Sequence, residues 1–303
     1  MLNDRAEPST PATAAAKPAL ASLIPPAALN RWPLLVGFAA LAVPTLVSLG
    51  NGTWTKEAGA HGPIVLATGA WLIWRNAAVM RQLAAPGSQV LGWLAFLASL
   101  GLYVFGRTFD FITFEAMGLF GVGLSMLYVL FGGRALLKTW FPFFYLAFLI
   151  PPPNWLMDRL TAPLKQFVSS AATGALYLTG LPIEREGVTI HVAQYSLLVE
   201  DACSGMNSLV GLIAISLFYI YLLRGSSVRY SAVLTLFVVP IAVLGNILRV
   251  MTLILLTYFA GDEVAQGFIH GLAGLFLFAV DLLLVFGVDV VLARFLPKSW
   301  RPQ

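Results

Sequence analysis

Charged residues and cysteine are the two things that this 303-residue chain has least of. Charged side chains make up only 11% of the chain, against 59% for hydrophobic side chains. One core of a soluble protein of this size could not bury so much apolar surface, so a polytopic membrane protein is predicted instead. The single cysteine, Cys203, excludes an internal disulfide and any cysteine-based zinc cluster. Its thiol is left for chemistry or for inert packing.

The basic residues do not form a nucleic-acid-binding surface. The net charge is +4, but lysines and arginines stand singly between apolar runs, so no nucleic-acid partner is expected. The chain has no glycine-rich phosphate-binding loop, and His191 has no companion at metal-ligand spacing. We therefore expect neither a cofactor nor a bound metal.

Eight apolar runs predict an all-α polytopic fold embedded in the lipid bilayer. They lie at about residues 33–50, 63–79, 89–106, 110–132, 136–151, 203–223, 230–260 and 270–293. Residues 1–30 are rich in alanine and proline and are predicted to be a disordered cytoplasmic tail.

The segment between the fifth and sixth runs has a different character. Residues 154–180 mix charged and hydroxyl side chains into an apolar background, as an interfacial helix does. Residues 184–201 alternate apolar and polar side chains on both sides of a short turn, which predicts a small β-hairpin. The hairpin must lie outside the hydrocarbon, because an open strand edge cannot face lipid.

These features divide the chain into four predicted regions. They are the tail at 1–30, a five-helix membrane region at 31–151, a periplasmic and interfacial segment at 152–202, and a catalytic three-helix membrane region at 203–303.

Lysine and arginine set the predicted orientation. With eight spans and a cytoplasmic N-terminus, twelve basic residues fall on the inner side and five on the outer side. This asymmetry agrees with the positive-inside rule, and a ninth span at 160–180 would destroy it. The outer face then holds residues 152–202 and the start of the helix at Cys203.

Cys203, Arg249 and His270 are predicted to reach the outer boundary on three separate helices. Each lies roughly twenty residues or slightly more from a basic inner loop, or roughly 30 Å at a helical rise of about 1.5 Å per residue. The estimate assumes straight helices. Pro240, and the apolar stretch 250–260 beyond Arg249, predict that the middle helix bends, tilts or partly re-enters.

The three side chains have complementary chemistry. A thiolate attacks a carbonyl, an imidazole takes and returns a proton, and a guanidinium stabilises an oxyanion. Supporting groups are expected nearby. The backbone N–H groups of Ser204 and Gly205 could add oxyanion donors, and Asn246 lies one turn before Arg249.

Each of these residues also has a purely structural interpretation. A lone cysteine can be inert packing, His270 can be a hydrogen-bonded interface residue, and Arg249 can belong to a structural ion pair. Glu200 and Asp201 can fix His270, attract the substrate, or cap the helix at Cys203. The residues alone leave these alternatives open.

Three sequence stretches around these residues occur in order, each on its own predicted span. They are EDACSGMNSL around Cys203, GNILRV around Arg249 and GFIHGLAG around His270. They resemble the three signature stretches of the exosortase/archaeosortase family. The likeness extends over roughly residues 140–293 and includes PPP at 151–153 and the LPIEREGVTIHV stretch.

The resemblance implies a membrane-embedded cysteine transpeptidase in the inner membrane of a Gram-negative bacterium, with its site facing the periplasm. Cys203 would be the acyl-accepting nucleophile, Arg249 the oxyanion stabiliser and His270 the acid/base. Its substrates would be membrane-anchored exported proteins that end in a Pro-Glu-Pro-like motif, a transmembrane helix and a basic tail. The work would be linked to surface sorting and exopolysaccharide. The acceptor stays open between water, an amine, and a lipid- or polysaccharide-linked group.

Two other functions also fit the residues. One is a transporter whose polar path is lined by Arg249, His270, Asp281 and Asp289, although no inverted repeat is visible. The other is a non-enzymatic assembly protein for envelope polysaccharide, with the external hairpin as its docking surface.

Overall fold

The apolar runs fold into helices. The computed structural model describes residues 32–55, 59–85, 87–198, 206–224, 228–261 and 268–295. The chain divides into two compact units, Met1–Ala42 and Val43–Gln303. Of the first unit the structure describes only the beginning of helix α2. All the contacts given in this article lie within the second unit.

The predicted all-α polytopic fold is confirmed. The helices are α2 (Trp32–Ser48), α3 (Gly62–Gln82), α4 (Gln89–Thr108), α5 (Ile112–Lys138), α6 (Trp140–Leu146), α7 (Asn154–Tyr177), α9 (Met206–Arg224), α10 (Val228–Ala260) and α12 (Phe268–Phe295), with a π-helix η2 (Leu49–Thr53) and a 3₁₀ turn η4 (Ala147–Leu149). By length and composition, six helices in the described ranges could cross a membrane. The other two predicted spans coincide with the shorter apolar helices Trp140–Leu149 and Val210–Leu223.

Helices α4 and α5 pack closely because glycine removes side chains from their contact. A Cβ at Gly106 would collide with the backbone of Glu115, and one at Gly118 would collide with the backbone of Tyr103. Small residues of this kind allow helices to approach where lipid offers no hydrophobic drive for association. Helices α4 and α5, which correspond to the third and fourth predicted spans, therefore form a tight helical hairpin.

The segment between α7 and α9 contains a three-stranded sheet, one strand more than predicted. Strands β1 (Ile183–Glu186), β2 (Thr189–Val192) and β3 (Tyr195–Leu198) form an antiparallel meander in the order β1-β2-β3. The β2–β3 pair is the predicted hairpin, with Ile190 opposite Leu197. Strand β1 was missed because its sequence, IERE, is mostly charged and has no apolar alternation.

One face of this sheet is covered by α7 and α10. Ile190, Val192 and Leu197 project from the sheet into a cluster that is at most 6% exposed. The cluster is completed by Val168, Ala172 and Leu176 of α7 and by Val250, Leu253 and Ile254 of α10. We call these nine residues the sheet cluster.

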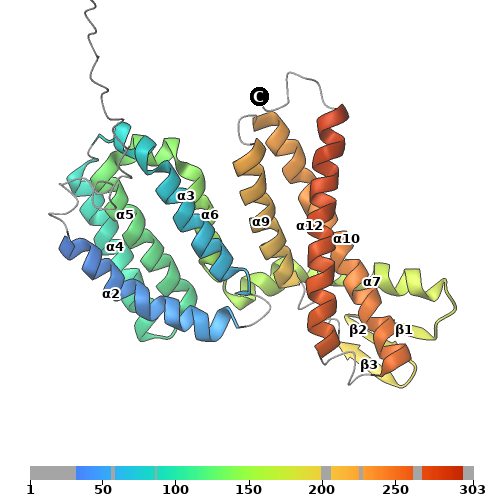
Figure 1. The fold of residues 1–303 in the computed structure, drawn as a ribbon. Coiled ribbons are helices and arrows are strands. Elements are labelled where there is room, and N and C mark those ends of the chain that lie inside the picture. The colour runs from blue at the N-terminus through green and yellow to red at the C-terminus, as the bar shows by residue number, and fades with distance from the viewer. Residues whose placement is uncertain are drawn as a thin grey trace, which may run out of the picture. The chain divides into compact units, whose positions relative to one another are not determined.

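The sheet cluster explains the length of α10. The helix has 33 residues, or about 50 Å at the usual rise, whereas the hydrocarbon core of a bilayer is about 30 Å thick. Its last turns pack on the sheet and α7, as can be followed in Figure 1. The apolar stretch 250–260 therefore contributes a protein core. The helix also continues through Pro240 without interruption. Whether it bends, tilts or partly re-enters the bilayer stays a prediction.

A buried carboxylate joins the three C-terminal helices. Asp289 of α12 is 1% exposed and accepts hydrogen bonds from Tyr219 of α9 (2.6 Å to Oδ2) and from Tyr230 of α10 (2.7 Å to Oδ1). The Tyr230 hydroxyl also lies 2.8 Å from the Asp289 carbonyl oxygen. We call these three residues the tyrosine clamp. Asp289 therefore has a structural role at the junction of these three helices.

Removing one hydroxyl of the clamp is expected to lower stability. Tyr230→Phe should cost about 1.5–3 kcal/mol, the usual contribution of a hydrogen bond to a charged group, because it leaves the buried Asp289 carboxylate short of a donor. Thermal unfolding in detergent would measure this loss. Tyr177→Phe is the matched control, because Tyr177 is 69% exposed at the end of α7. Equal midpoints for the two variants would show that the clamp does not hold these helices together.

Candidate active site

Arg249 is buried at the place where α10 enters the sheet cluster. Its side chain is only 6% exposed, and Asn246, one turn earlier on the same face, is 5% exposed. Val250, four residues after Asn246 and on the same side of α10, belongs to the sheet cluster. Burying a guanidinium is costly, so its position at this boundary indicates a role for its charge.

The structure explains why the GNILRV stretch begins with glycine, at Gly245. It lies four residues before Arg249, and a Cβ at this position would collide with the carboxylate of Asp281 on α12. A side chain at this position would have to displace the Asp281 carboxylate, so glycine favours the close approach of α12 to α10 one turn from Arg249. Asp281 itself is 9% exposed. In the sequence, only a glycine in the middle of a predicted helix marks this contact.

Helices α10 and α12 run antiparallel. Asp289 meets Tyr230 near the start of α10, and Asp281 meets Gly245 farther along it. The direction from Gly245 to Arg249 is thus also the direction from Asp281 to His270. Figure 1 shows α9, α10 and α12 side by side along this part of their length.

The backbone places His270 near the level of Arg249. His270 is the third residue of α12. Measured from the tyrosine clamp, both residues lie 19 positions along their helices. Measured from the nearer Gly245–Asp281 contact, Arg249 lies four positions away and His270 lies 11. At about 1.5 Å per residue, the difference between these last two counts corresponds to about 10 Å along the helix axes, or about two helical turns.

The remaining predicted site residues lie outside the described residues. They are Cys203, Glu200, Asp201, Ser204 and Gly205. The nearest described element is α9, which begins at Met206, three positions after Cys203, and packs against both α10 and α12. For His270 the description covers the helical backbone alone. The structure thus brings Arg249 and Asn246 together on one buried face, and the roles of all eight residues stay predictions.

The described residues offer no metal centre. Within the ranges that the structure covers, no three His, Cys, Asp or Glu side chains gather in a way that could hold a metal ion.

A family model described as transmembrane exosortase matches residues 53–287, which is well over half of the chain. The chain belongs to the transmembrane exosortase family. No curated protein and no solved structure matches it.

Membership of the exosortase family confirms the resemblance seen in the sequence. The matched region runs from the end of η2 into α12, so it contains Arg249, the Gly245–Asp281 contact and all three signature stretches. At the level of the family, this exosortase is a multi-pass membrane protein of the peptidase and transpeptidase type that acts on protein substrates.

Proposed function

We propose that this exosortase is a cysteine transpeptidase that cleaves the C-terminal sorting signal of exported proteins and passes the acyl group to an acceptor. Its substrates carry a Pro-Glu-Pro-like motif, a transmembrane helix and a basic tail. The observation that supports this most is the buried Arg249 on the face of α10 that meets α12, near the level of His270.

The reaction needs a nucleophile, a proton carrier and a fixed positive charge. The Cys203 thiolate sulfur attacks the scissile carbonyl carbon, and Arg249 stabilises the negative oxygen of the tetrahedral intermediate. The C–N bond then breaks, and protonated His270 gives its proton to the departing amine. A thioester joins the substrate to Cys203. An acceptor hydroxyl, amine or water attacks it, gives its proton to His270, and releases the thiolate.

Arginine suits the oxyanion role because it keeps its charge when buried. The guanidinium charge is delocalised over a planar group of five N–H donors, so it can meet an oxyanion with more than one hydrogen bond. Asn246, one turn away on the same face, is proposed to orient the guanidinium. The N–H groups of Ser204 and Gly205 are proposed as further oxyanion donors.

The acidic pair before the nucleophile has two proposed roles. Glu200 and Asp201 favour the N-terminus of the Cys203 helix electrostatically, and either carboxylate can orient the His270 imidazole. A fixed imidazole tautomer is what an acid/base needs in order to deliver its proton to one atom.

The site is proposed to face the periplasm from the inner membrane. The part of α10 beyond Arg249 packs on the sheet, so the sheet and Arg249 lie toward the same end of this helix. The sheet has an open β1 edge charged by Glu184, Arg185 and Glu186, which suits water and not lipid. A substrate anchored by its own helix would present its cleavage motif at this boundary.

Mass spectrometry of a substrate's new C-terminus tests the proposed function. A reporter with such a signal should be shortened at the motif in cells that express this exosortase. A free carboxylate at the new end indicates hydrolysis, and an added mass indicates transfer to an acceptor. An intact reporter in the presence of the folded enzyme would refute the assignment.

A further inference from the structure

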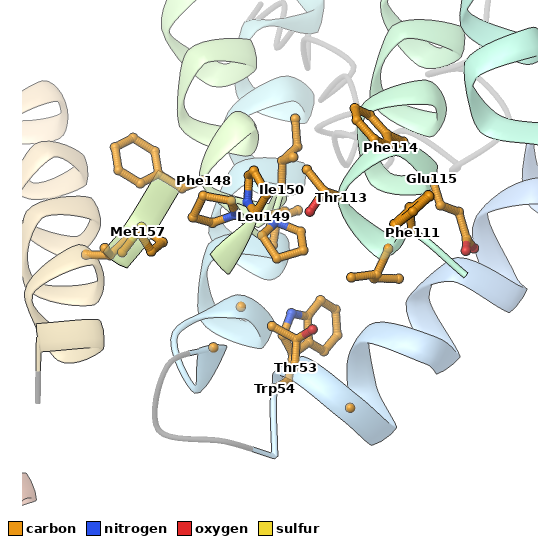
Figure 2. Close-up of a pocket in the computed structure, with 18 of the residues that line it drawn as sticks. Thr53, Trp54, Phe111, Thr113, Phe114, Glu115, Phe148, Leu149, Ile150 and Met157 are labelled. Atoms are coloured by element: carbon orange, nitrogen blue, oxygen red, sulfur yellow. The ribbon is translucent and has the colours of Figure 1, made fainter. Parts of the chain in front are cut away.

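A large cavity opens at one end of the N-terminal helices and is lined mainly by them and by α7, with one residue from α9. Its volume is about 1300 Å³, above the roughly 300–1,000 Å³ of ordinary small-molecule pockets. Trp54 after η2, Phe111 before α5 and Met157 of α7 surround the same hollow, as Figure 2 shows. The prolines at 151–153 line it too, which gives the PPP stretch a place in the structure.

Flat apolar groups form much of the wall. Phe111, Phe114, Phe144 and Trp155 all line the cavity and are between 38% and 62% exposed. Exposed aromatic side chains at span ends are ordinary interfacial anchors. Here they lie around one hollow together with polar groups, and this combination is what a ligand-binding site requires.

One face of α7 contributes a polar stripe to the cavity. Asp158, Thr161 and Lys165 all line it, and their spacing of three and four residues places them on the same side of the helix. The stripe offers a carboxylate, a hydroxyl and an ammonium group in sequence. It therefore provides both hydrogen-bond acceptors and donors.

A buried carboxylate fixes an arginine on another part of the wall. The Glu115 side chain is 4% exposed, and its Oε1 forms an ion pair with Arg107 Nη1 at 3.1 Å. The same oxygen accepts a hydrogen bond of 2.7 Å from the Thr45 hydroxyl. Ser48 accepts a further bond of 3.1 Å from the same Arg107 nitrogen. The Arg107 side chain is 47% exposed, so it is held in place while part of it still faces the surroundings.

The part of the lining that the structure describes carries no excess of positive charge. Among the described lining residues, the cations are Arg107 and Lys165 and the carboxylates are Asp110, Glu115 and Asp158. Burial lowers the pKa of His61, the one lining histidine, although a hydrogen bond to the Phe148 backbone opposes this. Glu115 is buried against Arg107, and Asp110 and Asp158 add two further carboxylates to the described lining. The described lining therefore disfavours a phosphate or another anion.

We propose that this cavity binds an uncharged carbohydrate group, and that this group belongs to the acceptor in acyl transfer. Sugar hydroxyls donate to carboxylates and accept from ammonium and guanidinium groups, and the C–H face of a sugar ring packs on flat aromatic side chains. The proposal deepens the transpeptidase function and rests on it for the acceptor role. The binding of the sugar is independent of catalysis.

The acceptor site is connected to the catalytic region through α9. Val210 of α9 lines the cavity, and Gly211 next to it packs against His61, where a Cβ would lie 3.1 Å from the His61 Cβ. Val210 follows Cys203 by seven positions. A chain of seven residues spans at most about 25 Å, so an extended acceptor could reach from the cavity toward the thioester.

Photo-crosslinking tests the cavity directly. The full chain, with Cys203→Ala to prevent turnover, is placed in phosphatidylcholine nanodiscs with octyl glucoside, galactoside or mannoside carrying a diazirine on the sugar. At least one should label peptides of the lining in a saturable way. The α7 variant D158A/T161V should weaken this labelling about tenfold, as expected for the loss of two hydrogen bonds. Gln166→Leu, an exposed position of α7 outside the lining, is the control.

Competitors distinguish the source of the sugar. Protection by free maltose as well as by unlabelled alkyl glycoside indicates a soluble oligosaccharide, and protection by the alkyl glycoside alone indicates a lipid-carried sugar. Equal protection by octyl sulfobetaine, which is zwitterionic and has no sugar, would overturn the proposal. So would unsaturable labelling for all three glycosides, or equal labelling of the α7 variant and its control.

The two proposals fail separately. If processing depends on Cys203 but no glycoside labels the cavity, the carbohydrate site is wrong and the transpeptidase stands. If the cavity is labelled but Cys203→Ala still processes substrate, the sugar site stands and the acceptor role falls.

Discussion

Replacing Cys203 with alanine is expected to stop substrate processing almost completely, with a loss on the order of 10³-fold or more, because no other group forms the thioester. Folding and insertion should persist, since the change removes one small atom group from a chain with no disulfide to lose. The rate of appearance of the shortened reporter, followed by mass spectrometry, measures the loss. Thermal unfolding of the same preparation shows that the protein is still folded.

The same residue can be examined without any substrate. Cys203 is the only cysteine, so every thiol-specific label on the protein reports on it. As the proposed nucleophile, it should react with an external maleimide-type probe below pH 8 faster than an ordinary thiol does. Cys203→Ser should process far more slowly than wild type. Full processing by Cys203→Ala, or a thiol as slow as a buried one, would contradict the nucleophile assignment.

Much of the membrane architecture could be predicted from hydrophobic run length alone. Each predicted span contains a helix, and the mixed segment from residue 154 forms α7, because a helix satisfies its backbone within one stretch of sequence. Strand β1 could not be found this way. Its residues Ile183–Glu186 pair with β2 across a turn and bury little, so their sequence carries no period of two. The region boundaries predicted at 31, 152 and 203 stay predictions.

The candidate site was predicted less completely, because its supports are contacts between distant residues. Counting helical rise placed Arg249 near the outer boundary, which stays a prediction, and the structure shows that α10 enters the sheet cluster directly after this residue. The apolar residues beyond Arg249 pack in one cluster with Val168 and Ile190, which lie more than 50 positions away in the sequence. Gly245 likewise needs Asp281 to explain it. The cavity was not foreseen, since its lining comes from eight or more separate elements and loops.

One of the four residues that would line the polar path of a transporter has a structural role instead. Asp289 had been considered as part of a polar path with Arg249, His270 and Asp281. Its two carboxylate oxygens instead accept hydrogen bonds from Tyr219 and Tyr230, at 2.6 and 2.7 Å, in a buried clamp. A carboxylate that holds three helices together cannot exchange its partners for a passing ion without breaking that junction.

Arg249→Gln is expected to lower kcat by about 10²–10³-fold and to leave KM nearly unchanged, because the oxyanion that it stabilises exists only in the transition state. Arg249→Lys should fall between this variant and wild type, since an ammonium keeps the charge but loses the planar fork of donors. Steady-state kinetics on a peptide or reporter substrate would separate kcat from KM. Arg75→Gln is the control, because Arg75 lies on α3 over the ring of Trp71 and outside the matched signature stretches.

Stability distinguishes this catalytic role from a structural ion pair at Arg249. Breaking a buried pair by removing one partner typically costs about 3–5 kcal/mol, so a structural role predicts a large drop in the unfolding midpoint of Arg249→Gln. A catalytic role predicts a folded variant that turns over slowly, because glutamine removes a buried charge and keeps most of the side-chain volume. A Lys variant with full kcat, or a Gln variant that loses stability but not kcat, would assign Arg249 to the fold. Arg249 is buried where α10 enters the sheet cluster. Because a residue at this place can serve packing as well as catalysis, both kcat and the unfolding midpoint must be measured.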